Sequence, residues 1–73
     1  MDHPRISQAP EIMGGKPCIT GTRIPVAHIL GYLAAGDSVE DVIESFPALT
    51  RDDVLAAIAF AADFLRKDGI VAA

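Results

Sequence analysis

The chain has 73 residues, of which 51% are hydrophobic and 22% charged, and its formal net charge is −4. This length permits one small domain, and the acidic balance excludes attraction to nucleic acid or anionic lipid over the whole surface. Cys18 is the single cysteine, which excludes an intrachain disulfide, and no His and Cys residues have zinc-site spacing. A core of this size contributes only about 3 to 5 kcal/mol, so we expect a homodimer or a partner protein to supplement it.

The chain divides into an N-terminal arm at 1–25, a three-helix bundle at 26–68 and a C-terminal tail at 69–73. Four of the five prolines lie in the arm and exclude a long helix there. Residues 6–8 predict a short strand that pairs with Thr20 to Ile24. No apolar segment has the length of a signal-peptide core or a membrane span, so we expect a cytoplasmic protein without membrane contact.

Residues 14–26 place glycines and prolines around a β-branched run, which predicts two turns flanking a strand and presents Lys16 and Arg23. A phosphate-binding P-loop is excluded because Lys16 precedes Pro17 instead of Ser or Thr, and no dinucleotide fingerprint occurs. We therefore expect no nucleotide or other cofactor. Arg23 has two interpretations: it fixes the arm by hydrogen bonds to loop carbonyls and a carboxylate, which we favour, or it reaches a phosphate.

The first helix is predicted from about Pro25, at its first helical position, to Ala35, with Gly36 as a left-handed stop. A capping box of Ser38 and Asp41 begins the second helix, which ends before proline 47. The apolar positions expected in the core are Val26, Ile29, Leu30 and Leu33 in the first helix and Val39, Val42, Ile43 and Phe46 in the second.

The third helix is predicted to begin with a capping box of Thr50 and Asp53 and to reach Lys67, with Gly69 as its stop. The short connection at 46–50 fits a helix-turn-helix. The residues of the third helix that are expected to face the core are Val54, Leu55, Ile58, Ala61, Ala62 and Leu65.

A second apolar flank of the third helix contains Ala57, Phe60 and Phe64. The apolar surface then covers about half of the helix or more, whereas a stripe of about 100° satisfies an ordinary surface helix. This excess predicts a dimer or partner interface at these three residues, and the open alternative is that the N-terminal arm covers Phe60 and Phe64.

Residues of catalytic type do not form a recognisable constellation. His3 is expected to be solvated, His28 to lie on a helix surface, and Cys18 to act as a small hydrophobe. Helix caps and dipoles account for the carboxylates in the first helical turns, namely Glu40, Asp41, Asp52 and Asp53. We therefore expect neither an enzyme nor a metal site.

The motif order resembles one small bacterial family, catalogued as domain of unknown function 433. The resemblance extends from about Ile6 to Leu65 and rests on Ile-Met-Gly-Gly-Lys-Pro at 12–17, Ile-Thr-Gly-Thr-Arg-Ile-Pro-Val at 19–26, Leu-x-x-Gly-Asp-Ser at 33–38 and Phe-Pro-x-Leu-Thr at 46–50. It implies a mainly α, homeodomain-like three-helix fold with a helix-turn-helix and, for some members, a role as antitoxin beside a PIN-like ribonuclease toxin.

Two functions follow as hypotheses. In the first, a homodimeric antitoxin neutralises a PIN-like nuclease toxin and binds its own operator DNA through Lys16, Arg23, Thr50 and Arg51. Asp52 and Asp53 beside Arg51 weaken the DNA-binding part, because phosphates repel carboxylates. In the second, the chain is a protein-interaction module without DNA binding, or a homodimeric structural protein, and its acidic and apolar surface meets a partner.

Overall fold

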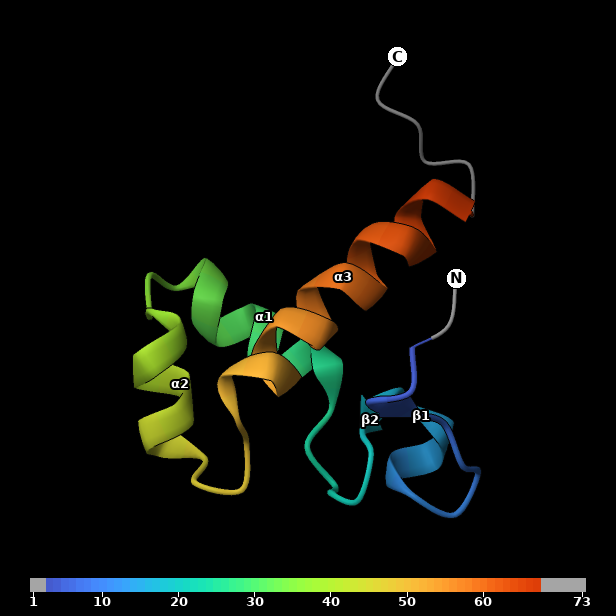
Figure 1. Cartoon of the computed structure of the whole chain (residues 1–73). Coiled ribbons are helices and arrows are strands. Elements are labelled where there is room, and N and C mark those ends of the chain that lie inside the picture. The colour runs from blue at the N-terminus through green and yellow to red at the C-terminus, as the bar shows by residue number, and fades with distance from the viewer. Residues whose placement is uncertain (1–2, 68–73) are drawn as a thin grey trace.

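The computed structural model describes residues 3–67 as three helices with a small antiparallel sheet near the N-terminus (Figure 1). The elements are β1 (Ile6–Ser7), the 3-10 turn η1 (Met13–Gly15), β2 (Cys18–Ile19), α1 (Val26–Ala34), α2 (Val39–Ser45) and α3 (Arg51–Lys67). Within this part of the chain, no helix is long and apolar enough to cross a membrane. The expected stop at Gly69 and the tail at 69–73 lie outside the described residues.

Both predicted capping boxes are confirmed, and they decide where α2 and α3 begin. The Ser38 N–H donates to Asp41 Oδ2 at 2.9 Å, and the Asp41 N–H donates to Ser38 Oγ at 3.0 Å. At α3, the Thr50 N–H donates to Asp53 Oδ2 at 2.9 Å and the Asp53 N–H to Thr50 Oγ1 at 3.2 Å. Each box satisfies N–H groups that a helix start leaves without intrahelical partners.

The start of α1 differs from the prediction, whereas its end agrees with it. Pro25 precedes the helix in an extended conformation, with φ −68° and ψ 143°, instead of occupying the first helical position. It is held there by a bridge to Cys18, and the Val26 N–H donates to the Pro17 carbonyl at 2.9 Å. At the other end, Gly36 has φ +106°, a conformation that few residues other than glycine adopt, and this stops the helix.

The short sheet uses a different second strand from the one predicted. Ile6 pairs with Ile19 and Ser7 with Cys18, so the partner of β1 lies before Thr20 to Ile24. The residues after Ile19 instead form a tight turn, in which the Thr22 hydroxyl donates to the Ile19 carbonyl at 2.8 Å. Gly21 has φ +82° in this turn, which an extended strand does not permit.

One core joins the sheet to all three helices. The fully buried hydrophobic residues are Cys18 and Ile19 from β2, Val26 and Ile29 from α1, Val42 from α2, Leu49 from the α2–α3 connection, and Val54 and Ala57 from α3. The other expected core residues of α1 and α2, namely Leu30, Leu33, Val39, Ile43 and Phe46, are partly buried against it. The core predictions for α1 and α2 are confirmed.

Gly31 and Gly36 predict opposite effects of alanine on stability. Gly31 lies inside α1 and a Cβ there would meet nothing within 4 Å, so Gly31→Ala should raise the free energy of unfolding by about 0.5 to 1 kcal/mol. Gly36→Ala, the matched control, should lower it by about 1 to 2 kcal/mol because φ is positive. Urea denaturation measures both, and a loss of stability in Gly31→Ala would contradict the open surroundings of this residue.

Candidate functional site

The face of α3 that enters the core differs from the predicted stripe. Val54 and Ala57 are 0% exposed, while Leu55, Ile58 and Leu65 are 44%, 40% and 46% exposed. The helix is rotated so that Val54, Ala57 and the partly buried Phe60 pack against the body. An assignment of Ala57 to a partner interface is therefore wrong, because the core already encloses its side chain.

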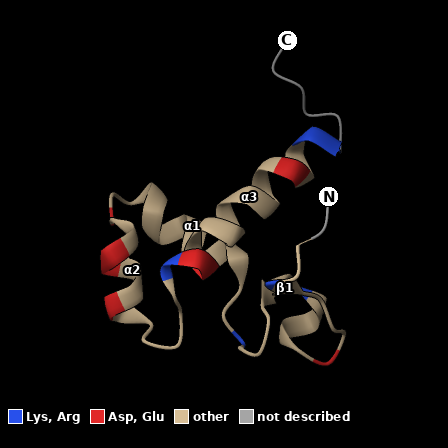
Figure 2. Ribbon diagram, in the orientation of Figure 1, with Lys and Arg blue, Asp and Glu red and all other residues tan. Residues whose placement is uncertain are grey.

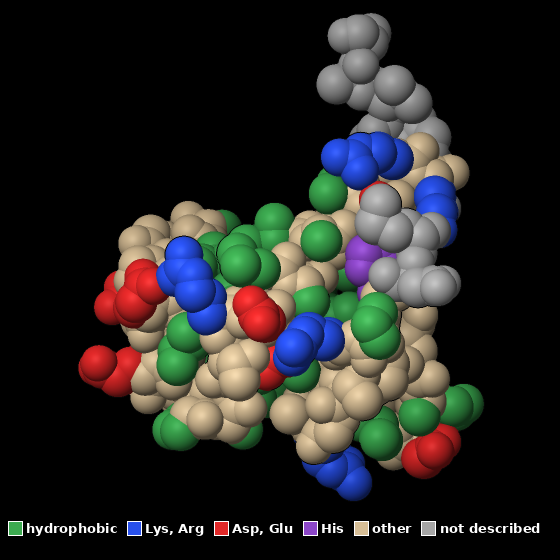
Figure 3. Space-filling model, in the orientation of Figure 1, with side chains coloured by type: hydrophobic (Ala, Val, Ile, Leu, Met, Phe, Trp, Pro, Cys, Tyr) green, Lys and Arg blue, Asp and Glu red, His purple; other side chains and the backbone are tan. Residues whose placement is uncertain are grey.

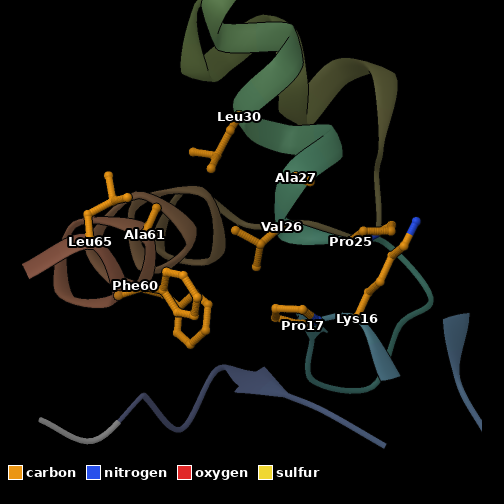
Figure 4. Close-up of a pocket in the computed structure, with 10 residues that line it drawn as sticks. Lys16, Pro17, Pro25, Val26, Ala27, Leu30, Phe60, Ala61 and Leu65 are labelled. Carbon is orange, nitrogen blue, oxygen red and sulfur yellow. The ribbon is translucent and has the colours of Figure 1, made fainter. Parts of the chain in front are cut away.

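An apolar groove with a volume of about 310 Å³ lies between α1, α3 and the segment before β2 (Figure 4). Lys16, Pro17 and Pro25 line it from the loops, Val26, Ala27 and Leu30 from α1, and Phe60, Ala61, Phe64 and Leu65 from α3. Phe64 is 53% exposed, the most among the exposed large hydrophobic residues of the described chain. In Figure 4 the amine of Lys16 lies at the edge of the groove and points away from its apolar floor. The groove thus combines a hydrophobic floor with one cation at its rim.

The N-terminal arm covers one side of Phe60. The His3 ring meets the Phe60 ring edge-on, with centroids 5.4 Å apart, and His3 Nε2 lies 2.8 Å from Asp63 Oδ2. His3 is therefore partly buried and hydrogen-bonded, and the expectation of a solvated side chain is wrong. The arm therefore covers Phe60, whereas Phe64 remains largely exposed in the groove.

Arg5 attaches the arm to the start of α3, the role that we expected of Arg23. Arg5 Nη1 donates to Asp53 Oδ1 at 2.9 Å, and Arg5 Nη2 lies 3.8 Å from Asp52 Oδ2. Burial raises the pKa of Asp53, but hydrogen bonds from the Thr50 backbone, Arg5 and the Thr50 side chain outweigh it and lower the pKa below its usual value. Arg23 is exposed and has no ion pair or side-chain hydrogen bond within residues 3–67.

The two arginines of the arm predict a stability difference. Arg5→Met should lower the free energy of unfolding by about 1 to 2 kcal/mol, because it leaves the buried Asp53 carboxylate without its charged donor. Arg23→Met is the matched control and should change it by less than about 0.5 kcal/mol. Chemical denaturation of both variants measures this difference, and equal losses would contradict the assignment of the arm contact to Arg5.

Asp63 predicts a loss of stability in acid. The hydrogen bond with His3, assisted by the nearby charge of Arg66, holds the pKa of Asp63 below its usual value. The pKa of Asp63 is lower in the folded chain than in the unfolded chain, where it is about 3.9, so between these two values the unfolded chain binds more protons. The contribution of Asp63 to the free energy of unfolding is therefore full above about pH 4 and is lost as the pH falls through the folded pKa. Asp63→Asn should lower the melting temperature at pH 7 and flatten its decline from pH 5 to pH 2.

The control for Asp63 is Glu11→Gln. Glu11 is an exposed arm carboxylate without an ion pair among residues 3–67. This variant should keep the wild-type pH dependence of the melting temperature. If Asp63→Asn also keeps it, the contact between His3 and Asp63 does not stabilise the fold.

The surface formed by α2 and the start of α3 is mainly acidic. Thr50 is exposed at the start of α3, and Arg51 is ion-paired with Glu40 of α2. Figure 2 shows acidic residues on α2 and in the first turn of α3, and basic residues at the far end of α3. Lys16 and Arg23 are also exposed, but they lie in the loops that flank β2. The four residues that we expected to contact nucleic acid therefore lie in separate segments of the chain. Among them, Thr50 and Arg51 are neighbours.

The remaining residues of catalytic type occupy the positions expected of them. His28 is exposed on α1. Cys18 is buried, and its thiol donates to the Lys16 carbonyl at 3.4 Å. Within residues 3–67, no group of three His, Cys, Asp or Glu side chains is arranged to hold a metal ion.

Comparison with known proteins gives three similarities. A family described as "Protein of unknown function (DUF433)" matches residues 6–61. Uncharacterized protein y4eO of Sinorhizobium fredii (strain NBRC 101917 / NGR234) is 40% identical over 56 residues, which are 77% of this chain and 25% of that relative. This chain therefore spans a quarter of the length of that relative. The crystal structure of a DUF433 member from Anabaena variabilis has a TM-score of 0.79 at 28% identity and covers 86% of this chain and 62% of that one.

Proposed function

Because the chain belongs to the DUF433 family of proteins of unknown function, we propose its function from the geometry of its surface. It is a protein-binding module, the antitoxin-like component of a two-gene pair, and it holds a segment of a PIN-like ribonuclease in the groove between α1 and α3. The antitoxin role comes from the family resemblance of the motifs. The groove is proposed as the binding site because its lining is apolar and Phe64 is exposed in it.

The groove is the observation that supports this proposal. Its floor is formed by aliphatic and aromatic side chains, and Phe64 leaves more than half of its surface open there. Exposed aromatic residues in concave apolar surfaces are frequent anchors of protein interfaces, where their burial supplies much of the binding free energy. A helix or extended segment with one or two apolar side chains is a suitable occupant.

The charge of the chain favours the same kind of partner. A ribonuclease needs a basic surface to hold RNA phosphates, and this chain has a net charge of −4. The acidic residues of α2 and Asp52 of α3 are exposed, and acidic side chains face solvent on one side of the molecule (Figure 3). An acidic surface speeds association with a basic nuclease and competes with its substrate.

Operator DNA is a second candidate, favoured by the connection from α2 to α3 at residues 46–50 and by the exposed Thr50 and Arg51. It ranks lower because Arg51 is already paired with Glu40, and the neighbouring Asp52 side chain is 74% exposed. Phosphates at this end of α3 would meet more carboxylates than cations.

Copurification with the products of adjacent genes, followed by a ribonuclease assay, tests the proposal. We expect capture of a nuclease that this chain inhibits, and Phe64→Ala should weaken that complex by at least about tenfold. Ala27→Glu, which adds a charge to the groove at an exposed position in the first turn of α1, should have the same effect. Met13→Ala is the control, because Met13 is an exposed hydrophobic residue outside the groove.

The outcomes separate the candidate functions. A complex that resists Phe64→Ala and Ala27→Glu would contradict binding in the groove. Absence of any captured nuclease, together with salt-dependent DNA binding that Arg51→Ala abolishes, would replace the proposal with operator recognition.

A further inference from the structure

α3 has a partly exposed apolar face that lies mostly outside the core and the groove. Leu55, Ile58, Ala62 and Leu65 follow one another at spacings of three, four and three residues. On a helix these positions lie within an arc of about 80°, and the spacing is that of the a and d positions of a coiled coil. Of the four, only Leu65 also lines the groove. We call these four residues the α3 seam.

The seam runs along α3 between oppositely charged ends. In the first turn, Arg51 is paired with Glu40 and the buried Asp53 with Arg5, so the acidic group open to a partner is Asp52. The last turn contains Arg66 and Lys67. The side chains of Asp52 and Arg66 are each 74% exposed. In Figure 3 hydrophobic side chains lie along α3 between charged groups near its two ends.

This charge pattern selects the orientation of an occupant with the same sequence. In a parallel pair of α3 helices, the acidic turns would lie side by side, and so would the basic turns. In an antiparallel pair, Asp52 of one copy lies near Arg66 and Lys67 of the other, and opposite charges meet at both ends. The second half of α3 projects beyond α1 and α2, which leaves it open to such a partner (Figure 1).

We propose that the occupant of the α3 seam is a second copy of this chain, packed antiparallel about a twofold axis near the middle of the seam. Leu55 of each copy then lies opposite Leu65 of the other, and Ile58 lies opposite Ala62. The seam spans only about 15 Å, at a rise of 1.5 Å per residue, so the interface is small. We expect a dissociation constant on the order of 10 µM.

Analytical ultracentrifugation of the full chain over a range of concentrations tests this dimer. Ile58→Glu should raise the dissociation constant by more than about tenfold, because it buries a carboxylate in the seam. Met13→Glu is the control for a new acidic group at an exposed hydrophobic position outside α3, and it should leave the constant unchanged. Far-ultraviolet circular dichroism confirms that each variant keeps its helices.

Cysteine crosslinking tests the orientation of the two copies. A mixture of Leu55→Cys and Leu65→Cys chains should form mixed disulfide dimers under mild oxidation, because these positions face each other in the antiparallel dimer. The natural thiol of Cys18 is buried and should not react. Leu55→Cys alone should not crosslink, whereas a parallel dimer would link it to itself.

Three results would overturn the proposal. The first is a wild-type chain that stays monomeric at about 0.5 mM, which is about fifty times the expected dissociation constant. The others are a dimer that tolerates Ile58→Glu and self-crosslinking of Leu55→Cys. The groove and the seam share Leu65, but Ile58 lies outside the groove and Phe64 lies outside the seam, so variants of these two residues distinguish the dimer from the proposed function. Loss of the dimer in Ile58→Glu while nuclease capture persists supports the dimer and shows that the partner binds without it.

Discussion

The buried carboxylate of Asp53 connects the separate parts of this small fold. One of its oxygens accepts the Thr50 N–H and closes the cap of α3, while the other accepts Arg5 Nη1 from the arm. The Arg5 carbonyl in turn accepts the Thr20 N–H, which links the arm to the turn after β2. A buried carboxylate is costly unless such donors surround it, so cap, arm and sheet stabilise one another through a single side chain.

The orientation of α3 follows from these contacts and determines which surfaces remain available. With Asp53 directed to the arm and Val54 and Ala57 in the core, the neighbouring positions Leu55 and Ile58 must face solvent. Beyond the body, Phe64 and Leu65 are left open for the same reason. Both proposed interaction surfaces therefore use apolar residues of α3 that the core does not enclose, and the groove adds residues of α1 and of the loops.

Local patterns predicted the helices well because their causes are local. The capping boxes at Ser38 and Thr50 and the positive φ at Gly36 depend on neighbours within a few residues, and all three agree with the structure. The register of β1 could not be predicted in this way. Thr20 to Ile24 contains β-branched residues typical of a strand, but the Thr22 side chain and Gly21 form a turn instead.

The candidate site shows the same division. Sequence reasoning identified the apolar excess on α3 and the exposure of Phe64, but it assigned Ala57 to an interface and missed His3, Arg5 and Asp63. The pairs His3–Asp63 and Arg5–Asp53 join residues 60 and 48 positions apart, and no periodicity within one segment can indicate them. The sequence contained only the residue types themselves: carboxylates on the third helix, and His3 and Arg5 in the arm without an assigned partner.

The sequence by itself determined the three helices, the capping boxes of α2 and α3, the family and the acidic, apolar character of the surface, since composition, motif order and short-range hydrogen bonding suffice for these. Only the tertiary structure decided which face of α3 is buried. That choice depends on long-range contacts with the arm and with α1 and α2, because an α-helix with apolar residues around more than half of its circumference has several rotations of similar hydrophobic burial.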